Sequence, residues 1–176
     1  MALAIASAPV KAANDGSINF KGKLTATTCK VEGEDPAGDN VKKEVLMGSV
    51  PVGHLSAAGS YATGKYFDIK IGGAGETDCT DGVKAMVRFD PRSPLIDGVT
   101  GNLKVDPAGS PATNVQIRLF DLGGTTPLNL LRDTSRPVEI ASNQATLPFV
   151  AEYFSPAGGA TAGDANSIVG FQVIYE

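Results

Sequence analysis

The chain has 176 residues and a formal net charge of -4, with 15 lysines and arginines against 19 aspartates and glutamates. Weak acidity with only 19% charged residues argues against a nucleic-acid-binding protein, which usually carries a basic surface stripe. One histidine and two cysteines are too few for the usual structural zinc site, while 21 glycines and 11 prolines disfavour long helices.

The N-terminal residues are small and apolar, and they predict an exported protein. Residues 2–10 resemble the C-terminal half of a secretory signal peptide, with Val10 and Ala12 at the small-residue positions of a cleavage site. We therefore expect residues 1–12 to be a signal-peptide remnant and Ala13 to be the mature start. The alternative is a short apolar tail with no role in export.

The rest of the chain alternates apolar and polar residues in short segments, as half-buried strands do. Clusters of glycine, proline, serine and aspartate separate these segments, which predicts turns. About eight short strands without a long helix predict a single β-sandwich or barrel. The expected strands cover residues 18–24, 44–52, 66–71, 83–89, 115–120, 137–140, 145–153 and 168–175.

The two cysteines, Cys29 and Cys79, predict one disulfide if the chain is exported. The bridge would close a loop of about 50 residues and stabilise the fold by roughly 4 kcal/mol in the chain-entropy model. Two buried free thiols are the alternative for a chain that stays in a reducing compartment.

No residue pattern indicates an enzyme, a metal site or a cofactor. His54 is isolated beside a Gly- and Ala-rich stretch, and neither a nucleophile elbow nor a zinc-protease motif occurs. Glu76, Asp78 and Asp81 lie close in sequence, but calcium needs about 6 to 8 oxygen ligands in a defined loop. A solvated acidic turn is therefore the favoured interpretation.

Several segments in their order along the chain resemble a known family. Residues 15–22 lead into Cys29, and the expected strand 66–71 precedes Cys79. Two more expected strands follow at residues 114–121 and 147–153. Near the C-terminus, residues 162–166 contain a glycine fourteenth from the end, and residues 170–175 end in the penultimate tyrosine. Over residues 14–176 the chain resembles a major pilin of the chaperone-usher fimbriae, type 1 class. The interval between the cysteines is longer than the family's, and we interpret residues 53–63 as a loop insertion.

The resemblance implies an all-β fold, an incomplete immunoglobulin-like sandwich that a donor strand from a neighbouring subunit completes. Residues 13–24 would be the N-terminal extension that supplies this strand, and residues 25–176 the pilin domain. Alternate residues of the extension share one face and would enter the neighbour's groove: Gly16, Ile18, Phe20, Gly22 and Leu24. Residues 18–24 could instead be the first strand of the chain's own domain.

The acceptor groove and the chaperone contact would lie along the last strand. The resemblance points to Gly163, Val169, Phe171, Val173 and Tyr175, although these residues could be ordinary core. The implied function is a structural subunit of an adhesive fimbrial rod, exported through the periplasm to the cell surface. Its expected partners are identical or related pilin subunits, a periplasmic chaperone, an outer-membrane usher, and a tip adhesin or adaptor. A minor adaptor or tip pilin and a lone sugar-binding β-sandwich are the alternatives.

Overall fold

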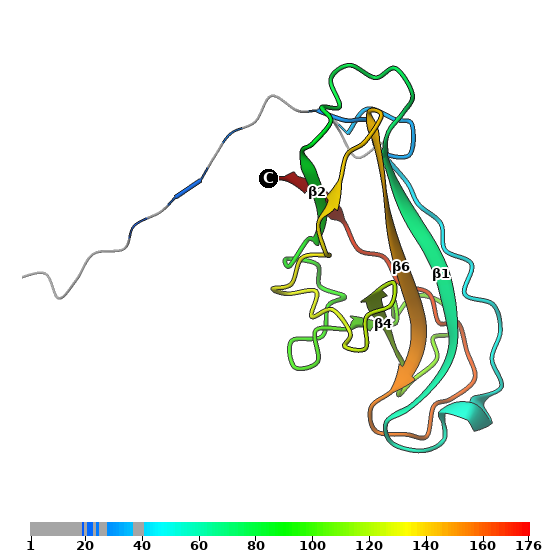
Figure 1. Ribbon diagram of the computed structural model, residues 1–176. Coiled ribbons are helices and arrows are strands. Elements are labelled where there is room, and N and C mark those ends of the chain that lie inside the picture. The colour runs from blue at the N-terminus through cyan, green and yellow to red at the C-terminus, as the bar shows by residue number, and fades with distance from the viewer. Residues whose placement is uncertain (1–18, 20, 23, 25–27, 37–40) are drawn as a thin grey trace, which may run out of the picture.

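The fold is almost entirely β-structure. Figure 1 shows the computed structural model, which describes residues 19, 21, 22, 24, 28–36 and 41–176. Within these residues there is one short 3-10 helix, η1 (Val52–Leu55). The strands are β1 (Ser60–Gly72), β2 (Lys84–Phe89), β3 (Leu103–Lys104), β4 (Gln116–Asp121), β5 (Val138–Glu139), β6 (Gln144–Ser155) and β7 (Phe171–Tyr175).

The larger sheet has the strand order β1-β6-β4-β3, and all its pairs are antiparallel. The long strands β1 and β6 pair from Ser60 opposite Ser155 to Gly72 opposite Gln144, with an irregularity between Ala62 and Lys65. Strand β6 forms because small and large apolar residues alternate with residues of the outer face. Its inward residues Ala145, Leu147, Phe149, Ala151 and Tyr153 are all buried.

The smaller sheet has the order β5-β2-β7, so β7 lies at its edge. Within the larger sheet the Phe149 ring stacks on Phe67 of β1 at 5.3 Å, and across the core it forms a T-shaped contact with Phe89 of β2 at 6.1 Å. The largest fully buried side chains belong to the same core and include Ile69, Ile71, Val87, Leu130, Ile140 and Leu147. Two antiparallel sheets packed around one core confirm the predicted sandwich class.

The prediction of a β-strand at residues 44–52 is wrong. Residues 41–50 are extended but belong to no ladder, and residues 52–55 form η1 instead. The alternation of apolar and polar residues predicted an extended backbone here, but it could not show whether a neighbouring strand is present to form a ladder. Residues 53–63 are only partly a loop, since β1 begins at Ser60, and the two-residue strand β3 was too short to predict.

Candidate functional site

The inward face of β7 is less buried than that of its ladder partner. Strand β2 pairs with β7 so that Phe89 lies opposite Phe171, Val87 opposite Val173, and Ala85 opposite Tyr175. The three β2 residues are 4%, 0% and 0% exposed, whereas all three β7 residues are only partly buried. Residues directly opposite in an antiparallel pair point to the same side of the sheet. The core is therefore covered over β2 and incompletely covered over β7.

The backbone of β7 is paired on one side only. Within the described residues its sole ladder partner is β2, and bonds between Lys84 and Glu176 extend that ladder by one residue. Its other edge presents a row of backbone groups that no described strand pairs with. An edge of this kind next to incompletely covered apolar side chains is a ready site for strand addition.

The extended segment 41–50 follows the outer edge of β1 in Figure 1. Val41, Met47 and Val50 turn toward the core and are, like the β7 row, only partly buried. Among the described residues no backbone-to-backbone hydrogen bond joins this segment to another part of the chain. We call the space between this wall and β7 the groove.

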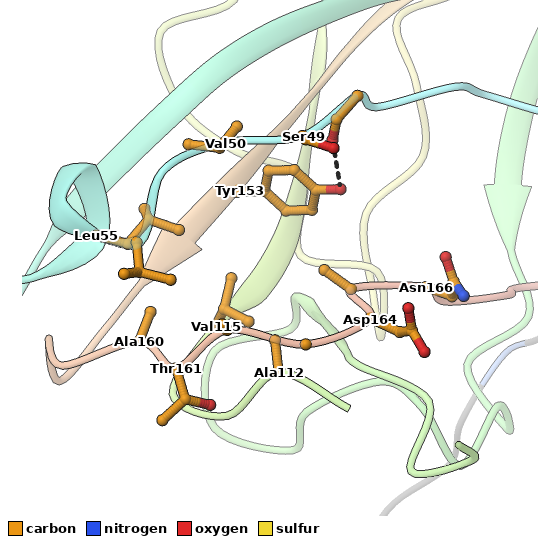
Figure 2. A pocket seen from close by; sticks show the side chains of 15 residues that line it. Ser49, Val50, Leu55, Ala112, Val115, Tyr153, Ala160, Thr161, Asp164 and Asn166 are labelled. Atoms are coloured by element: carbon orange, nitrogen blue, oxygen red, sulfur yellow. Dashed lines mark hydrogen bonds between the residues drawn. The ribbon is translucent and has the colours of Figure 1, made fainter. Parts of the chain in front are cut away.

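A cavity of about 390 Å³ lies at the end of the groove that precedes β7. Figure 2 shows it between residues 48–55 on one side and residues 160–166 on the other, with Val115 and Tyr153 facing it from the core. The Tyr153 hydroxyl donates to the Gly48 carbonyl at 3.4 Å, and burial raises the pKa of this tyrosine. The cavity walls are mostly apolar or small, so they fit an apolar side chain.

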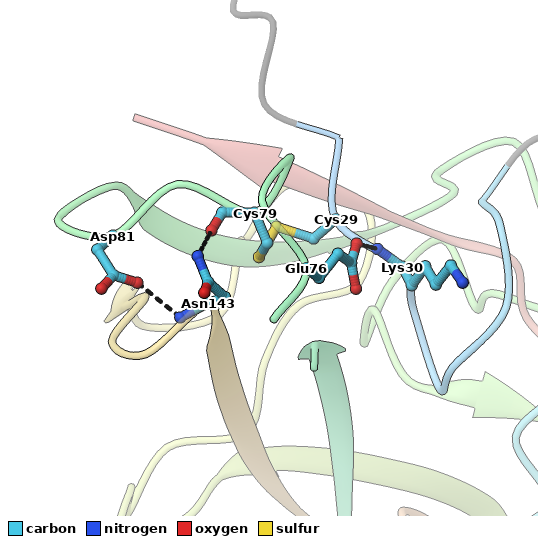
Figure 3. Close-up of a disulfide and its surroundings, with 6 residues drawn as sticks. All are labelled: Cys29, Lys30, Glu76, Cys79, Asp81 and Asn143. Atoms are coloured by element: carbon cyan, nitrogen blue, oxygen red, sulfur yellow. Dashed lines mark hydrogen bonds between the residues drawn. A yellow bond between two sulfur atoms is a disulfide. The ribbon is translucent and has the colours of Figure 1, made fainter. Parts of the chain in front are cut away.

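The disulfide lies at the opposite end of the groove, beside the end of β7. Cys29 and Cys79 are bonded as predicted, with both side chains fully buried (Figure 3). Burial raises the pKa of Tyr175, a backbone hydrogen bond from Cys29 opposes that shift, and the charge of Glu76 adds to it. The penultimate tyrosine therefore joins the last strand to the segment that carries the first cysteine.

The acidic residues near the disulfide are occupied by backbone and loop contacts. Glu76 accepts the Lys30 backbone N–H at 2.5 Å, and Asp81 accepts the Asn143 backbone N–H at 2.6 Å. In the part of the chain that the structure describes, no group of acidic, histidine or cysteine side chains is arranged to hold a metal ion. No described helix has the length and apolar character needed to cross a membrane.

Gly163 has a role different from that of the β7 residues. It lines the cavity, and its φ of +155° falls where side chains are rarely accommodated. A Cβ atom there would come within 2.5 Å of the Ala112 nitrogen and 2.6 Å of the Ser110 oxygen. The glycine therefore permits two backbones to approach closely at the cavity wall. Val169, predicted with it, is partly buried against the core just before β7.

Most of the predicted donor segment lies outside the described residues, including Gly16, Ile18 and Phe20, as do the expected signal-peptide remnant and its cleavage site. Gly22 and Leu24 are described and exposed. The Leu24 side chain is 101% exposed and contributes nothing to this subunit's own core. Residues of the cavity wall, such as Val50, Leu55 and Val115, were not predicted, because they come from separate segments with no common motif.

The fold and the groove together define an incomplete antiparallel β-sandwich of the immunoglobulin-like pilin type. The family model described as fimbrial protein matches residues 18–176, so the chain belongs to the fimbrial protein family. It is a structural subunit of a fimbrium, a surface appendage, and the family is structural rather than enzymatic.

Two curated relatives match over nearly their whole length. The F17 fimbrial protein of Escherichia coli is 31% identical over 99% of this chain and 94% of its own. The major fimbrial subunit SMF-1 of Stenotrophomonas maltophilia (strain K279a) is 33% identical over 97% of this chain and 99% of its own.

Solved structures show the same fold at low sequence identity. The P pilus rod subunit PapA superimposes with a TM-score of 0.60 at 15% identity, covering 85% of this chain and 99% of PapA. A subunit from a chaperone-usher pilus structure gives a TM-score of 0.58, also at 15% identity, over 96% of this chain and 100% of its own.

Proposed function

We propose that the chain is the major, rod-forming subunit of a chaperone-usher fimbria and that it polymerises by donor-strand exchange. Residues 13–24 of one copy would fill the groove of the next, and residues 25–176 would form the accepting domain. The observation that carries this proposal is the unequal burial of opposite residues in β2 and β7. An inserted strand would pair with the open edge of β7 and bury its half-exposed row.

The cavity supports one orientation of the inserted strand. From Tyr175 back to the cavity the β7 row spans about ten residues, or roughly 33 Å, and the donor row from Gly16 to Leu24 spans roughly 26 Å. The donor row is long enough to have one end at the cavity while the rest lies along β7. Of its two end residues only Leu24 has a side chain that can fill that space, so the donor would run antiparallel to β7. Gly16 would then lie near the bulky Tyr175.

The assembly that follows is a head-to-tail polymer. The donor segment and the groove are different surfaces, so the contact is heterologous and generates an open filament when its rotation does not close. Two of the described relatives support the rod assignment, because one is named a major fimbrial subunit and one solved neighbour is a rod subunit. A tip adhesin or adaptor would cap such a rod.

Export would precede assembly. Residues 1–12 would be removed as the signal-peptide remnant, and the groove would be filled in the periplasm by a strand of a chaperone that contacts Val169, Phe171, Val173 and Tyr175. An outer-membrane usher would then exchange that strand for the extension of the next subunit. A neighbour solved as part of a chaperone-usher pilus supports this route.

The test uses deletion and a matched peptide. A chain lacking residues 13–24 should bind chaperone yet form no filaments by electron microscopy. A synthetic peptide of residues 13–24 should form a one-to-one complex with this truncated chain. In the peptide, Leu24→Ala should weaken binding roughly 10- to 100-fold, the equivalent of roughly 1.5–3 kcal/mol for a buried leucine. Lys21→Ala, on the other face of the strand, is the control. Filaments from the deletion variant would refute the donor assignment.

A further inference from the structure

One wall of the groove is held by side chains instead of a backbone ladder. Strand β7 is fixed to β2 by ladder bonds along its length. The opposite wall, residues 41–50, has no backbone-to-backbone bond to the rest of the described chain. Its position must therefore depend on side-chain contacts, and these are few.

Lys43 makes the ion-pair contacts of this wall. Its Nζ lies 2.9 Å from the Glu32 Oε2 and 3.4 Å from the Asp68 Oδ1 of β1. Lys43 and Glu32 are largely shielded from solvent, with side-chain exposures of 24% and 18%. At the other end of the wall the only polar contact among described residues is the Tyr153 hydroxyl on the Gly48 carbonyl.

Glu32 is itself fixed to β1, which makes it a rigid anchor. Its Oε1 accepts the Lys70 backbone N–H at 2.8 Å, and its own N–H donates to the Lys70 carbonyl at 2.9 Å. The chain reaches this position with a φ of +53° at Glu32, an unusual conformation for a residue with a side chain. The contact from Lys43 therefore runs through Glu32 to the edge strand of the larger sheet.

The position of Lys43 within its segment is also unusual. Val41, Lys43, Val45 and Met47 share one side of the extended chain, and all are partly buried. Three of the four are apolar, so a fourth apolar residue would fit the row. Burial lowers the pKa of Lys43, but the hydrogen bond and charge of Glu32, with those of Asp68, outweigh this and raise it. An ion pair that is partly shielded from solvent in an otherwise apolar row is best explained when it specifies one arrangement.

We propose that Lys43 is a positioning residue of the groove: clasped by Glu32 and Asp68, it fixes the wall at residues 41–50 at the spacing that an inserted strand needs. This inference rests on the proposed strand exchange. A strand must lie about 4.8 Å from each neighbour to form ladder bonds. A wall that is held in place before the strand arrives lowers the entropy cost of binding, which is the general advantage of a preorganised site.

The experiment uses the full-length, monomeric chain and a fluorescent peptide of residues 13–24 as the probe. Lys43→Met keeps the length of the side chain and removes the clasp, and should weaken peptide binding about three- to tenfold, the effect of losing two partly exposed ion contacts. Lys43→Arg should bind nearly as wild type. Lys42→Met is the matched control, because Lys42 is exposed and forms no ion pair within the described residues.

Two further measurements separate positioning from general stability. The backbone ¹⁵N order parameters of residues 41–50, measured by NMR relaxation, should fall in Lys43→Met but not in Lys42→Met. Arg118→Met removes an ion pair with Glu152 on the outer face of the larger sheet, so it should lower stability without weakening peptide binding. Asp68→Asn provides a milder disruption of the clasp and should weaken binding less than Lys43→Met.

The outcomes distinguish a failure of the Lys43 inference from a failure of the donor-strand proposal on which it rests. If wild type and Lys43→Met bind the peptide equally, or if Arg118→Met weakens binding as much, the positioning role is overturned. If the wild-type chain binds no peptide, the donor-strand proposal fails instead. Unchanged order parameters at residues 41–50 in Lys43→Met would refute the clasp whichever way the peptide experiment turns out.

Discussion

Substituting Gly163 by alanine should destabilise the subunit more than replacing a glycine in an open turn. The new Cβ would lie 2.5 Å from the Ala112 nitrogen and 2.6 Å from the Ser110 oxygen. Both atoms are held in place, because the Ala112 N–H donates to the Asp164 carbonyl and the Asp164 N–H donates to the Ser110 carbonyl, each at 2.8 Å. Relief of the clash must weaken these bonds.

The magnitude follows from two contributions. Two weakened backbone hydrogen bonds cost about 1 kcal/mol each, and a side chain at this φ adds about 1–3 kcal/mol of backbone strain. We therefore expect Gly163→Ala to lower the free energy of unfolding by roughly 3–5 kcal/mol in urea titrations of the monomeric full-length chain.

Gly159→Ala is the control for backbone strain without a clash. Gly159 has a φ of +66°, and the nearest atom to a Cβ there is 4.0 Å away. Its substitution should cost only about 1 kcal/mol. If Gly163→Ala loses no more stability than Gly159→Ala, the close backbone approach is not a constraint, and the reason given for this glycine is wrong.

Three other changes test the stability of the fold. Replacing Cys29 and Cys79 by serine should lower the unfolding free energy by roughly 4 kcal/mol in urea; a loss below about 1 kcal/mol would contradict the entropic argument. Asp97 has a lowered pKa, chiefly because it accepts a backbone N–H in its turn. The stabilisation it gives relative to Asp97→Asn should therefore be complete well above the ordinary aspartate pKa and shrink as the pH falls through that value; a pH-independent difference contradicts this. Arg118→Met should cost about 2 kcal/mol by thermal or urea unfolding, because it leaves the shielded Glu152 carboxylate unpaired; no loss would contradict that assignment.

The sign for Asp97 follows from its partners. Its Oδ1 accepts the N–H groups of Val99 and Thr100 and the Thr100 hydroxyl, and all three contacts favour the ionised carboxylate. A pKa lower in the folded chain than in the unfolded chain means that the unfolded chain binds more protons as the pH falls. Stability from this group is therefore present above its unfolded pKa and is lost as the pH falls through its folded one.

Alternation in the sequence predicted the strands but not the completeness of the sandwich. Ala85, Val87 and Phe89 in β2 alternate with outward residues just as Phe171, Val173 and Tyr175 do in β7. Periodicity reports which side of a strand faces inward, and it carries no information on whether another strand lies beside it. The difference in burial between the two rows emerges only when the sheet order is known.

Other parts of the site were beyond prediction for a related reason. The cavity at Tyr153 combines residues 48–55, 112–115 and 160–166, which are far apart in the chain and share no pattern. The cation–π contacts of Arg118 with Tyr61, Phe120 and Phe154 likewise join three strands. In the sequence Lys43 is a single charged residue in an alternating apolar row. Its role could not be predicted, because it depends on Glu32 and Asp68 lying near it in the fold.

In the proposed exchange the two walls of the groove would constrain an incoming strand in different ways. Backbone groups of β7 would fix the register, because a ladder shifted by one residue would turn every inward side chain outward. Within the described residues the segment 41–50 carries no ladder bonds and has polar contacts only through Lys43 and Gly48, so it would set the width of the groove instead. A donor would have to satisfy both conditions, and Leu24 at the cavity would decide the direction. Specificity for one strand would then arise from the register of β7, the spacing of residues 41–50 and the filled cavity acting together.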